Sequence, residues 1–155
     1  MRIAIIAVGR LGRAPEAALA VDYAARATAA GRSLGLGPIE LLETESRKPG
    51  KAAEGQALEA LLMAGDHLIA CDEHGEAWTS RDFAGRMAGL RDGGTRRLVL
   101  AIGGADGLDA GLLGRARARL AFGAQTWPHA LARVMLAEQI YRGIAILAGS
   151  PYHRD

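Results

Sequence analysis

Short apolar runs alternate with longer segments whose apolar residues recur at helical spacing, and this alternation predicts a β-α repeat. Strands are predicted where short, often β-branched runs meet Gly, Pro or Asp, at residues 2–8, 39–42, 67–71 and 97–102, with a further strand near 124–126. Helices are predicted at residues 15–30, 52–64, 80–90, 110–120 and 128–147. About five such units in succession favour one α/β domain over residues 1–155, a parallel sheet with helices on both faces.

The last predicted helix has a sharp start and an apolar stripe. Thr126 is a suitable N-cap, and Pro128 suits the first turn because its missing N–H is not needed there. The stripe predicts a face packed against the core: Leu131, Val134, Met135, Ile140 and Ile144.

The few polar residues of this helix occur in pairs four positions apart. His129 and Arg133 therefore share one face. Glu138 precedes Arg142 in the order that favours a helical ion pair.

The composition is that of a soluble globular protein. Half of the 155 residues are apolar and 23% are charged, and no apolar run has the length of a membrane span. The single cysteine, Cys71, excludes an internal disulfide, and the first residues lead into a strand without a signal-peptide pattern. We therefore expect a cytoplasmic protein with no membrane partner.

The charge is unevenly distributed, although the net charge is only +2. Residues 1–93 hold 11 basic and 13 acidic side chains, whereas residues 94–155 hold 8 basic and 4 acidic ones. The positive half could meet phosphates, but charge alone favours a solvated helix face. Both interpretations stay open for two further groups of basic residues. The first is a predicted lid or binding arm at 44–53. The second occupies alternate positions of the helix predicted at 110–120: Arg115, Arg117 and Arg119.

Three predicted loops leave strands at the carboxyl edge of the sheet, where the ligands of parallel sheets bind. They span residues 72–75, 103–107 and 122–127. The glycines of the second loop let the backbone approach a ligand, or they simply make a tight turn from strand to helix. Their spacing is not the G-x-G-x-x-G of nicotinamide sites, and we exclude that class. The side chains around the first loop match no zinc spacing, so no metal site is predicted: His67, Asp72, Glu73 and His74.

Several short motifs, taken together, resemble the RlmH (YbeA-like) family of the SPOUT superfamily over essentially the whole chain. They are an Ile-Gly-Gly-x-x-Gly-Leu turn at 102–108, a Thr-aromatic-Pro-His helix start at 126–129, Arg133, a Glu-Gln-x-Tyr-Arg run at 138–142 and a Tyr-His-Arg tail. The resemblance implies methyl transfer from S-adenosylmethionine, without a metal, to N3 of a pseudouridine in 23S ribosomal RNA. It also implies a deep C-terminal trefoil knot, action on the assembled ribosome, and a homodimer in which one subunit's tail completes the other's site.

The same resemblance assigns a pocket for the methyl donor. Gly103 and Gly104 would contact it through their backbone, and Cys71, where relatives often carry leucine, would pack on it as an inert thiol. The following loop would hold adenine with its main chain in an apolar slot, although Phe122 and Trp127 alone would pass for core aromatics. The members of this loop are Phe122, Gly123, Ala124, Gln125, Thr126 and Trp127.

The resemblance also implies which polar residues serve the reaction. Arg154 and Arg133 could hold a phosphate or a developing oxyanion, and Tyr152 and His153 could stack on the flipped base or hydrogen-bond to it. His129 is a candidate general base or a structural neighbour of the donor. Glu138 and Arg142 could be purely structural. The alternative function is a non-catalytic α/β module that binds a ribosome or a nucleotide, although such a module would not need the polar tail.

Overall fold

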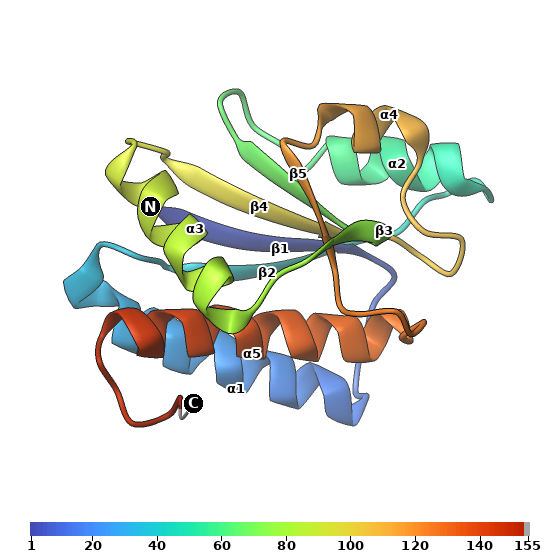
Figure 1. Cartoon of the computed structure of the whole chain (residues 1–155). Helices are drawn as coiled ribbons and strands as arrows, with labels where there is room; N and C mark the ends of the chain where they lie inside the picture. The colour runs from blue at the N-terminus through green and yellow to red at the C-terminus, as the bar shows by residue number, and fades with distance from the viewer. Residues whose placement is uncertain (154–155) are drawn as a thin grey trace.

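The computed structural model describes residues 1–153 as an α/β fold around one parallel sheet (Figure 1). The strand order is β2-β1-β4-β3-β5, and every pair is parallel. The strands are β1 (Arg2–Val8), β2 (Ile39–Thr44), β3 (His67–Ala77), β4 (Arg97–Ile102) and β5 (Ala118–Ala121). The helices are α1 (Pro15–Gly31), the short 3-10 helix η1 (Arg32–Leu34), α2 (Lys51–Glu59), α3 (Ser80–Asp92), α4 (Ala110–Arg115) and α5 (His129–Leu147).

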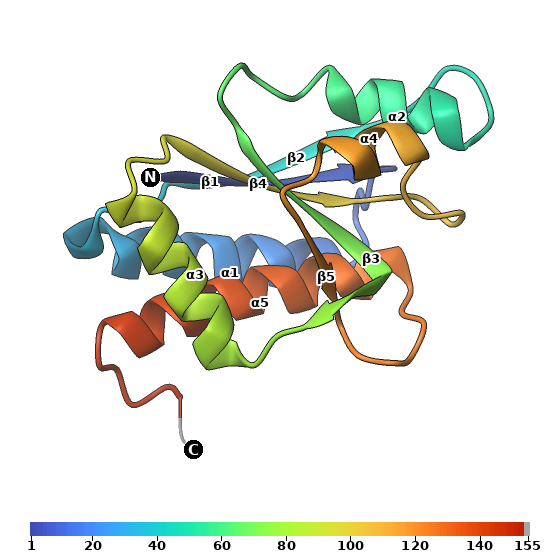
Figure 2. The same ribbon diagram turned by 45° about the horizontal axis from the view of Figure 1, so that its top comes forward.

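Helices cover both faces of the sheet, as the β-α repeat predicts. Figures 1 and 2 show α1, α3 and α5 on one face and α2 and α4 on the other. Each face has its own apolar core, with Leu98, Leu100 and Ile102 of β4 on the α5 side and Val99 and Ala101 on the α2 side. Every residue of β4 is buried, as a central parallel strand requires. Within residues 1–153, no helix is long and apolar enough to cross a membrane.

The last strand lies earlier in the chain than predicted. The expected helix at 110–120 ends at Arg115, and β5 occupies 118–121 instead of 124–126. The residue after Arg115, Ala116, already has an extended backbone, and the chain then alternates exposed Arg119 with buried Leu120. That period of two belongs to a strand and not to a helix. The prediction of Arg115, Arg117 and Arg119 on one helix is therefore wrong for the last two.

The turn predicted at residues 72–75 is also wrong, because β3 runs through it to Ala77. The register between β3 and β5 shifts between Cys71 and Glu76, so that both Cys71 and Glu76 pair with Leu120. Gly75 lies against the β5 backbone, where a Cβ would come within 2.7 Å of the Arg119 carbonyl carbon. A bulge of this kind lets the strand bend past the end of the sheet and still pair with its neighbour.

Side-chain N-caps define the starts of α3 and α4. The Asp109 carboxylate accepts hydrogen bonds from the N–H groups of Gly111 and Leu112 at the start of α4. Thr79 accepts one from the N–H of Asp82, whose carboxylate accepts in return from the N–H of Thr79. These caps satisfy backbone donors that a helix start leaves without partners, and they fix where each helix begins.

The start of α5 differs from the prediction. Pro128 is the N-cap residue and the helix begins at His129, so Thr126 does not cap it. A residue before proline is restricted to extended conformations, and Trp127 therefore cannot belong to the helix. Residues 122–127 are consequently free to form a loop at the end of β5.

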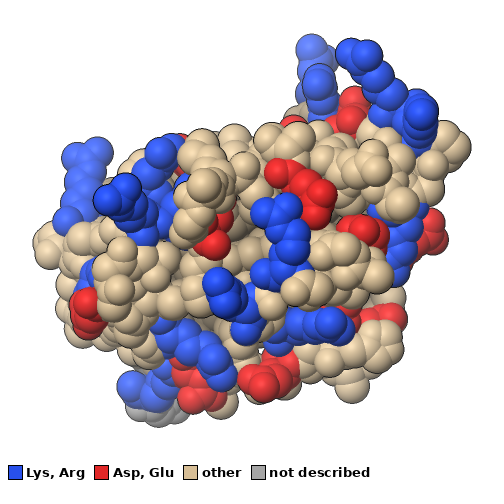
Figure 3. Space-filling model, turned by 90° about the horizontal axis from the view of Figure 1, so that it is seen from above, with Lys and Arg blue, Asp and Glu red and all other residues tan. Residues whose placement is uncertain are grey.

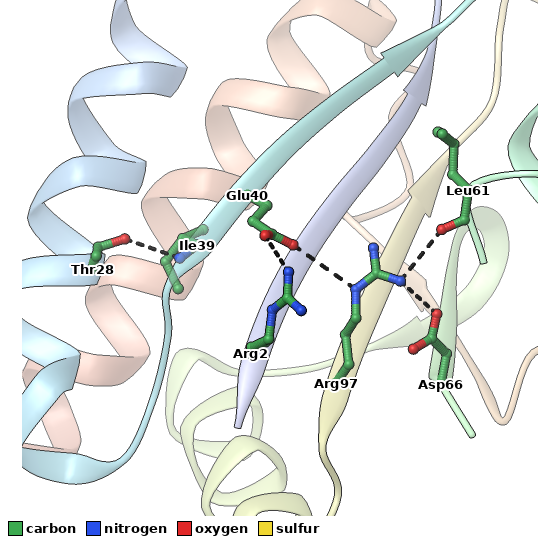
Figure 4. Close-up of polar contacts among 7 residues, drawn as sticks. All are labelled: Arg2, Thr28, Ile39, Glu40, Leu61, Asp66 and Arg97. Atoms are coloured by element: carbon green, nitrogen blue, oxygen red, sulfur yellow. Dashed lines mark hydrogen bonds and ion pairs between the residues drawn. The ribbon is translucent and has the colours of Figure 1, made fainter. Parts of the chain in front are cut away.

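The opposite, amino edge of the sheet is closed by ion pairs (Figure 4). The buried Arg97 at the start of β4 donates from Nη1 to Asp66 at 2.7 Å and to the Leu61 carbonyl at 3.3 Å. Its Nε lies 4.0 Å from Glu40, which also pairs with Arg2 at 2.5 Å. Charged groups on several segments therefore join at this edge.

Candidate active site

A cavity of about 270 Å³ opens at the carboxyl edge of the sheet, where β4 and β5 end and β3 bends past them. Its apolar lining includes Cys71 of β3, Ile102 at the end of β4 and Leu120 of β5. Its remaining walls come from residues 103–108, from the loop after β5 and from the start of α5. The convergence of separate loops at this edge is the arrangement predicted from the parallel sheet.

The glycine turn that follows β4 has no room for side chains. A Cβ on Gly103 would collide with the Gly107 carbonyl group, and one on Gly104 would come within 2.7 Å of a Glu54 carboxylate oxygen. The turn is closed by a hydrogen bond from the N–H of Gly107 to the Gly104 oxygen at 3.1 Å. The cavity therefore faces bare backbone here, as a close-fitting ligand requires.

The loop between β5 and α5 supplies most of the predicted donor-pocket residues. Phe122, Gly123, Gln125, Thr126 and Trp127 all line the cavity. Gly123 has a φ of 107°, a conformation that side chains disfavour. The Trp127 side chain is 39% exposed, so it is a wall of the cavity and not a plain core aromatic.

One predicted member of the loop behaves differently. Ala124 is exposed and stands outside the cavity lining found for residues 1–153. Cys71, by contrast, lies in the lining, and desolvation raises the pKa of its thiol to about 12. The thiol therefore stays protonated and packs as a small apolar group, which suits the inert role predicted for it.

Polar groups form a further part of the wall. Lys51, Asp72, Glu73, His74 and Asp106 line the cavity. Sequence reasoning placed the two acidic segments near this edge but gave these side chains no role. Lys51 could have been found from its position in the long loop after β2, because the carboxyl end of β2 lies at the same edge of the sheet. The described residues hold no group of three or more His, Cys, Asp or Glu side chains placed to bind a metal ion.

Of the predicted polar reaction residues, His129 lines the cavity and Arg133 does not. The Arg133 guanidinium donates to the carbonyl oxygens of Val8 and Gly9 and to the Glu43 carboxylate at 2.8 Å. Desolvation lowers the pKa of Arg133, and Glu43 opposes that shift. These contacts join α5 to the ends of β1 and β2. The hydrogen bonds of Arg133 therefore stabilise the fold.

The tail turns back along α5 and is held there by Glu138. The Glu138 carboxylate accepts from Arg142 Nη2 at 2.5 Å and from the Tyr152 hydroxyl at 3.0 Å. The Tyr152 ring lies 4.6 Å from the Tyr141 ring, centroid to centroid, and Arg142 Nη1 lies 3.5 Å from His153 Nδ1. The predicted Glu138–Arg142 ion pair is confirmed.

The tail of a chain lies away from the cavity of the same chain. Tyr152 is held beside Glu138, and His129 at the cavity stands nine positions earlier on α5, a rise of about 14 Å along the helix. Burial, with hydrogen bonds to Tyr23 and Glu138, raises the pKa of Tyr152, so its hydroxyl remains a donor at neutral pH. Arg154, the last predicted reaction residue, lies outside the described residues. One chain thus assembles the predicted donor pocket but does not bring Tyr152 into it.

Comparison with known proteins agrees with this arrangement. The family model described as "Predicted SPOUT methyltransferase" matches residues 1–153. A protein of Caulobacter vibrioides and one of Phenylobacterium zucineum, each named ribosomal RNA large subunit methyltransferase H, are 63% and 64% identical over 155 residues. The alignments cover all of this chain and 99% and 100% of these two relatives. The chain therefore belongs to the RlmH family of SPOUT methyltransferases.

Proposed function

We propose that this protein transfers a methyl group from S-adenosylmethionine to N3 of a pseudouridine in 23S ribosomal RNA, of the pseudouridine-1915 type. The cavity at the carboxyl edge carries the proposal, because its glycine turn and its 122–127 loop are the segments that the family resemblance assigns to the donor. The names of the two relatives supply the large-subunit ribosomal RNA as substrate.

The cavity is suited to such a donor in shape and in charge. At about 270 Å³ it is close to the lower limit of pockets for small molecules, roughly 300 Å³. The sulfonium and ammonium groups of S-adenosylmethionine are cationic, and the carboxylates of Asp72, Glu73 and Asp106 line the wall. Adenine can bond to the backbone of residues 122–127 with Phe122 and Trp127 beside it. Nothing in this donor set calls for a metal.

The protein's own contribution to the reaction is positioning and control of one proton. The bound donor supplies the methyl group, and the acceptor nitrogen is an imide that must lose its proton. His129 stands at the cavity and is a candidate to accept it. Tyr152, which stays protonated, can donate a hydrogen bond to the base, and Arg154 can stabilise the negative charge that develops on it.

The proposal requires two copies of the chain. Tyr152 of one copy is held near the middle of α5, away from that copy's own cavity, so a tail that serves the reaction serves a neighbour's cavity. We accordingly propose a homodimer that acts on the assembled ribosome in the cytoplasm. We further propose the deep C-terminal trefoil knot, and the meeting of residues 103–107 with residues 122–127 in one cavity is compatible with it.

Two measurements test the function. Titration calorimetry should detect S-adenosylmethionine binding at one site per chain, and radioactive methyl groups should then enter ribosomes from cells that lack this activity. Mapping the product by mass spectrometry should place the methyl group on N3 of one pseudouridine. Donor binding without methyl transfer to ribosomes would instead favour a non-catalytic ribosome-binding module and contradict the proposal.

A further inference from the structure

Many exposed cations on this protein have a carboxylate partner. On the helices that pack away from the cavity, Arg26 pairs with Asp22 and Arg86 with Glu76. Other exposed cations have none. Among residues 1–153, no ion pair with a carboxylate joins four exposed cations of the loop before α2 and of β5, which we call the cation rim: Arg47, Lys48, Lys51 and Arg119.

The first part of the cation rim is the loop between β2 and α2. The Ser46 hydroxyl accepts a hydrogen bond from the N–H of Lys48 and donates one to its carbonyl oxygen at 2.6 Å. This small turn leaves the side chains of Arg47 and Lys48 exposed. Lys51 follows at the start of α2 and lines the cavity itself. The loop therefore places positive charge beside the glycine turn.

The second part of the cation rim lies on β5, the end strand of the sheet. Leu120 belongs to the core on the α5 side, so its neighbour Arg119 points toward the face that carries α2 and α4. Arg119 is also close to the cavity, because the backbone of Gly75, next to the cavity residue His74, packs against it. Because β3 lies between β4 and β5, the distance from β5 to β4 is about 10 Å at the usual strand spacing.

The cavity lining holds more acidic than basic side chains. Asp72, Glu73 and Asp106 line it together with Lys51, and the three carboxylates would repel a phosphate while suiting a cationic donor. Figure 3, which looks onto the α2 and α4 face, shows Lys and Arg side chains spread over the face with Asp and Glu side chains among them. The carboxylates of the cavity disfavour a phosphate directly over it, so a polyanion is favoured with its phosphates on the rim and an uncharged group over the cavity.

We infer that the cation rim binds the RNA backbone on either side of the target base, with the loop at 45–51 contacting one flank and β5 the other. This inference rests on the proposed function, which supplies the RNA. Phosphates contribute to nucleic-acid binding through the release of bound counterions, so exposed cations without carboxylate partners are the side chains that a backbone-binding surface needs.

The test compares two variants of the rim. Arg119→Gln removes the β5 flank, and Arg47→Gln with Lys48→Gln removes loop cations outside the donor cavity. The control is Arg32→Gln with Arg96→Gln, two exposed cations toward the amino edge of the sheet that have no ion pair among the described residues. The control therefore removes the same charge as the loop double variant without touching the rim.

Binding to 50S and 70S ribosomes is measured by sedimentation across a range of salt concentrations, with S-adenosylmethionine affinity measured separately by calorimetry. The loop double variant should weaken ribosome binding about tenfold or more, and its log-log salt slope should fall by roughly 1.4 to 1.8, as expected for two lost phosphate contacts. Arg119→Gln should lower the slope by about half as much, as expected for one lost contact. The control should change neither quantity by more than about twofold, and donor affinity should be unaffected in all variants.

The inference would be overturned by rim variants that bind ribosomes with the affinity and salt slope of the wild type, or by a control that loses as much. A failure of the proposed function gives a different result. In that case the wild type binds the donor but transfers no methyl group to ribosomes, while the sedimentation experiment still decides whether the rim binds RNA.

Discussion

The two edges of the parallel sheet differ, because side chains fill the amino edge and a cavity opens at the carboxyl edge. At the amino edge, Arg97 and Asp66 fill the end of the sheet with a buried ion pair, and the space is closed (Figure 4). At the carboxyl edge, Gly103 and Gly104 contribute only backbone to the wall of a cavity that remains open. The difference shows that this fold does not make a binding site at strand ends by default. The residue types after each strand decide whether an edge is closed for stability or left open for a ligand.

The largest expected effect is at the closed edge. Arg97→Ala removes the partner of a carboxylate that is only 6% exposed, and we expect it to lower the free energy of unfolding by about 3 to 5 kcal/mol. Urea unfolding measures the loss. The double change Arg97→Met with Asp66→Leu should recover most of it, because no buried charge is left alone. If the single change costs under about 1 kcal/mol, this ion pair does not hold the edge together.

The next effect is at the open edge, and it concerns ligand affinity. Gly103→Ala places a methyl group against the Gly107 backbone and must displace the turn. We expect the dissociation constant for S-adenosylmethionine to rise about 30-fold, roughly 2 kcal/mol, in calorimetry. Gly114→Ala is the matched control, because nothing lies within 4 Å of its added Cβ. Equal donor binding by both variants would mean that the turn does not contact the donor.

A smaller effect should appear as a pH dependence of stability. The folded protein keeps the Cys71 proton up to about pH 12, whereas the unfolded chain loses it near the usual pKa of 9.0. The folded state therefore binds more protons between these values, and the stabilisation is complete below pH 9 and is lost as the pH rises above it. From about pH 9 to 10, the wild type should lose about 1 kcal/mol more than Cys71→Ala in urea unfolding. Parallel curves for the two proteins would contradict a desolvated thiol.

The smallest effect returns to the amino edge. Arg2 pairs with Glu40, but its side chain is 49% exposed and water screens the pair. Arg2→Ala should therefore cost less than about 1 kcal/mol of unfolding free energy. The difference from the wild type should shrink further in about 0.5 M salt, because exposed charges are screened. A loss as large as that of Arg97→Ala would show that exposure does not separate the two pairs.

The sequence predicts the carboxyl edge better than the details around it. Strand spacing and the run Gly103-Gly104 suffice to place backbone loops together at the ends of parallel strands, and the structure brings them together. The position of β5 is missed because a four-residue strand with Arg119 in it and Arg117 before it carries little apolar signal. Its place is decided by long-range pairing with β3, which local periodicity does not record.

The contacts of individual side chains also differ in how well the sequence predicts them. The family resemblance makes Arg133 a candidate reaction residue, whereas its guanidinium donates to a distant pair of carbonyl groups at the end of β1. The Glu138–Arg142 pair depends only on helical spacing, and it is predictable for that reason. Contacts within one helix follow from sequence, whereas contacts between segments far apart in the chain do not.

The contact between Tyr152 and Glu138 affects how the protein should be handled in the laboratory. A purification tag fused after the last residue would extend the segment that this contact holds against α5, and, if this segment serves a neighbouring cavity as proposed, the tag would obstruct it. A label inserted near Gly94, an exposed turn at the amino edge, avoids both the tail and the cavity. Assays on tail-tagged preparations would then understate the activity of the natural protein.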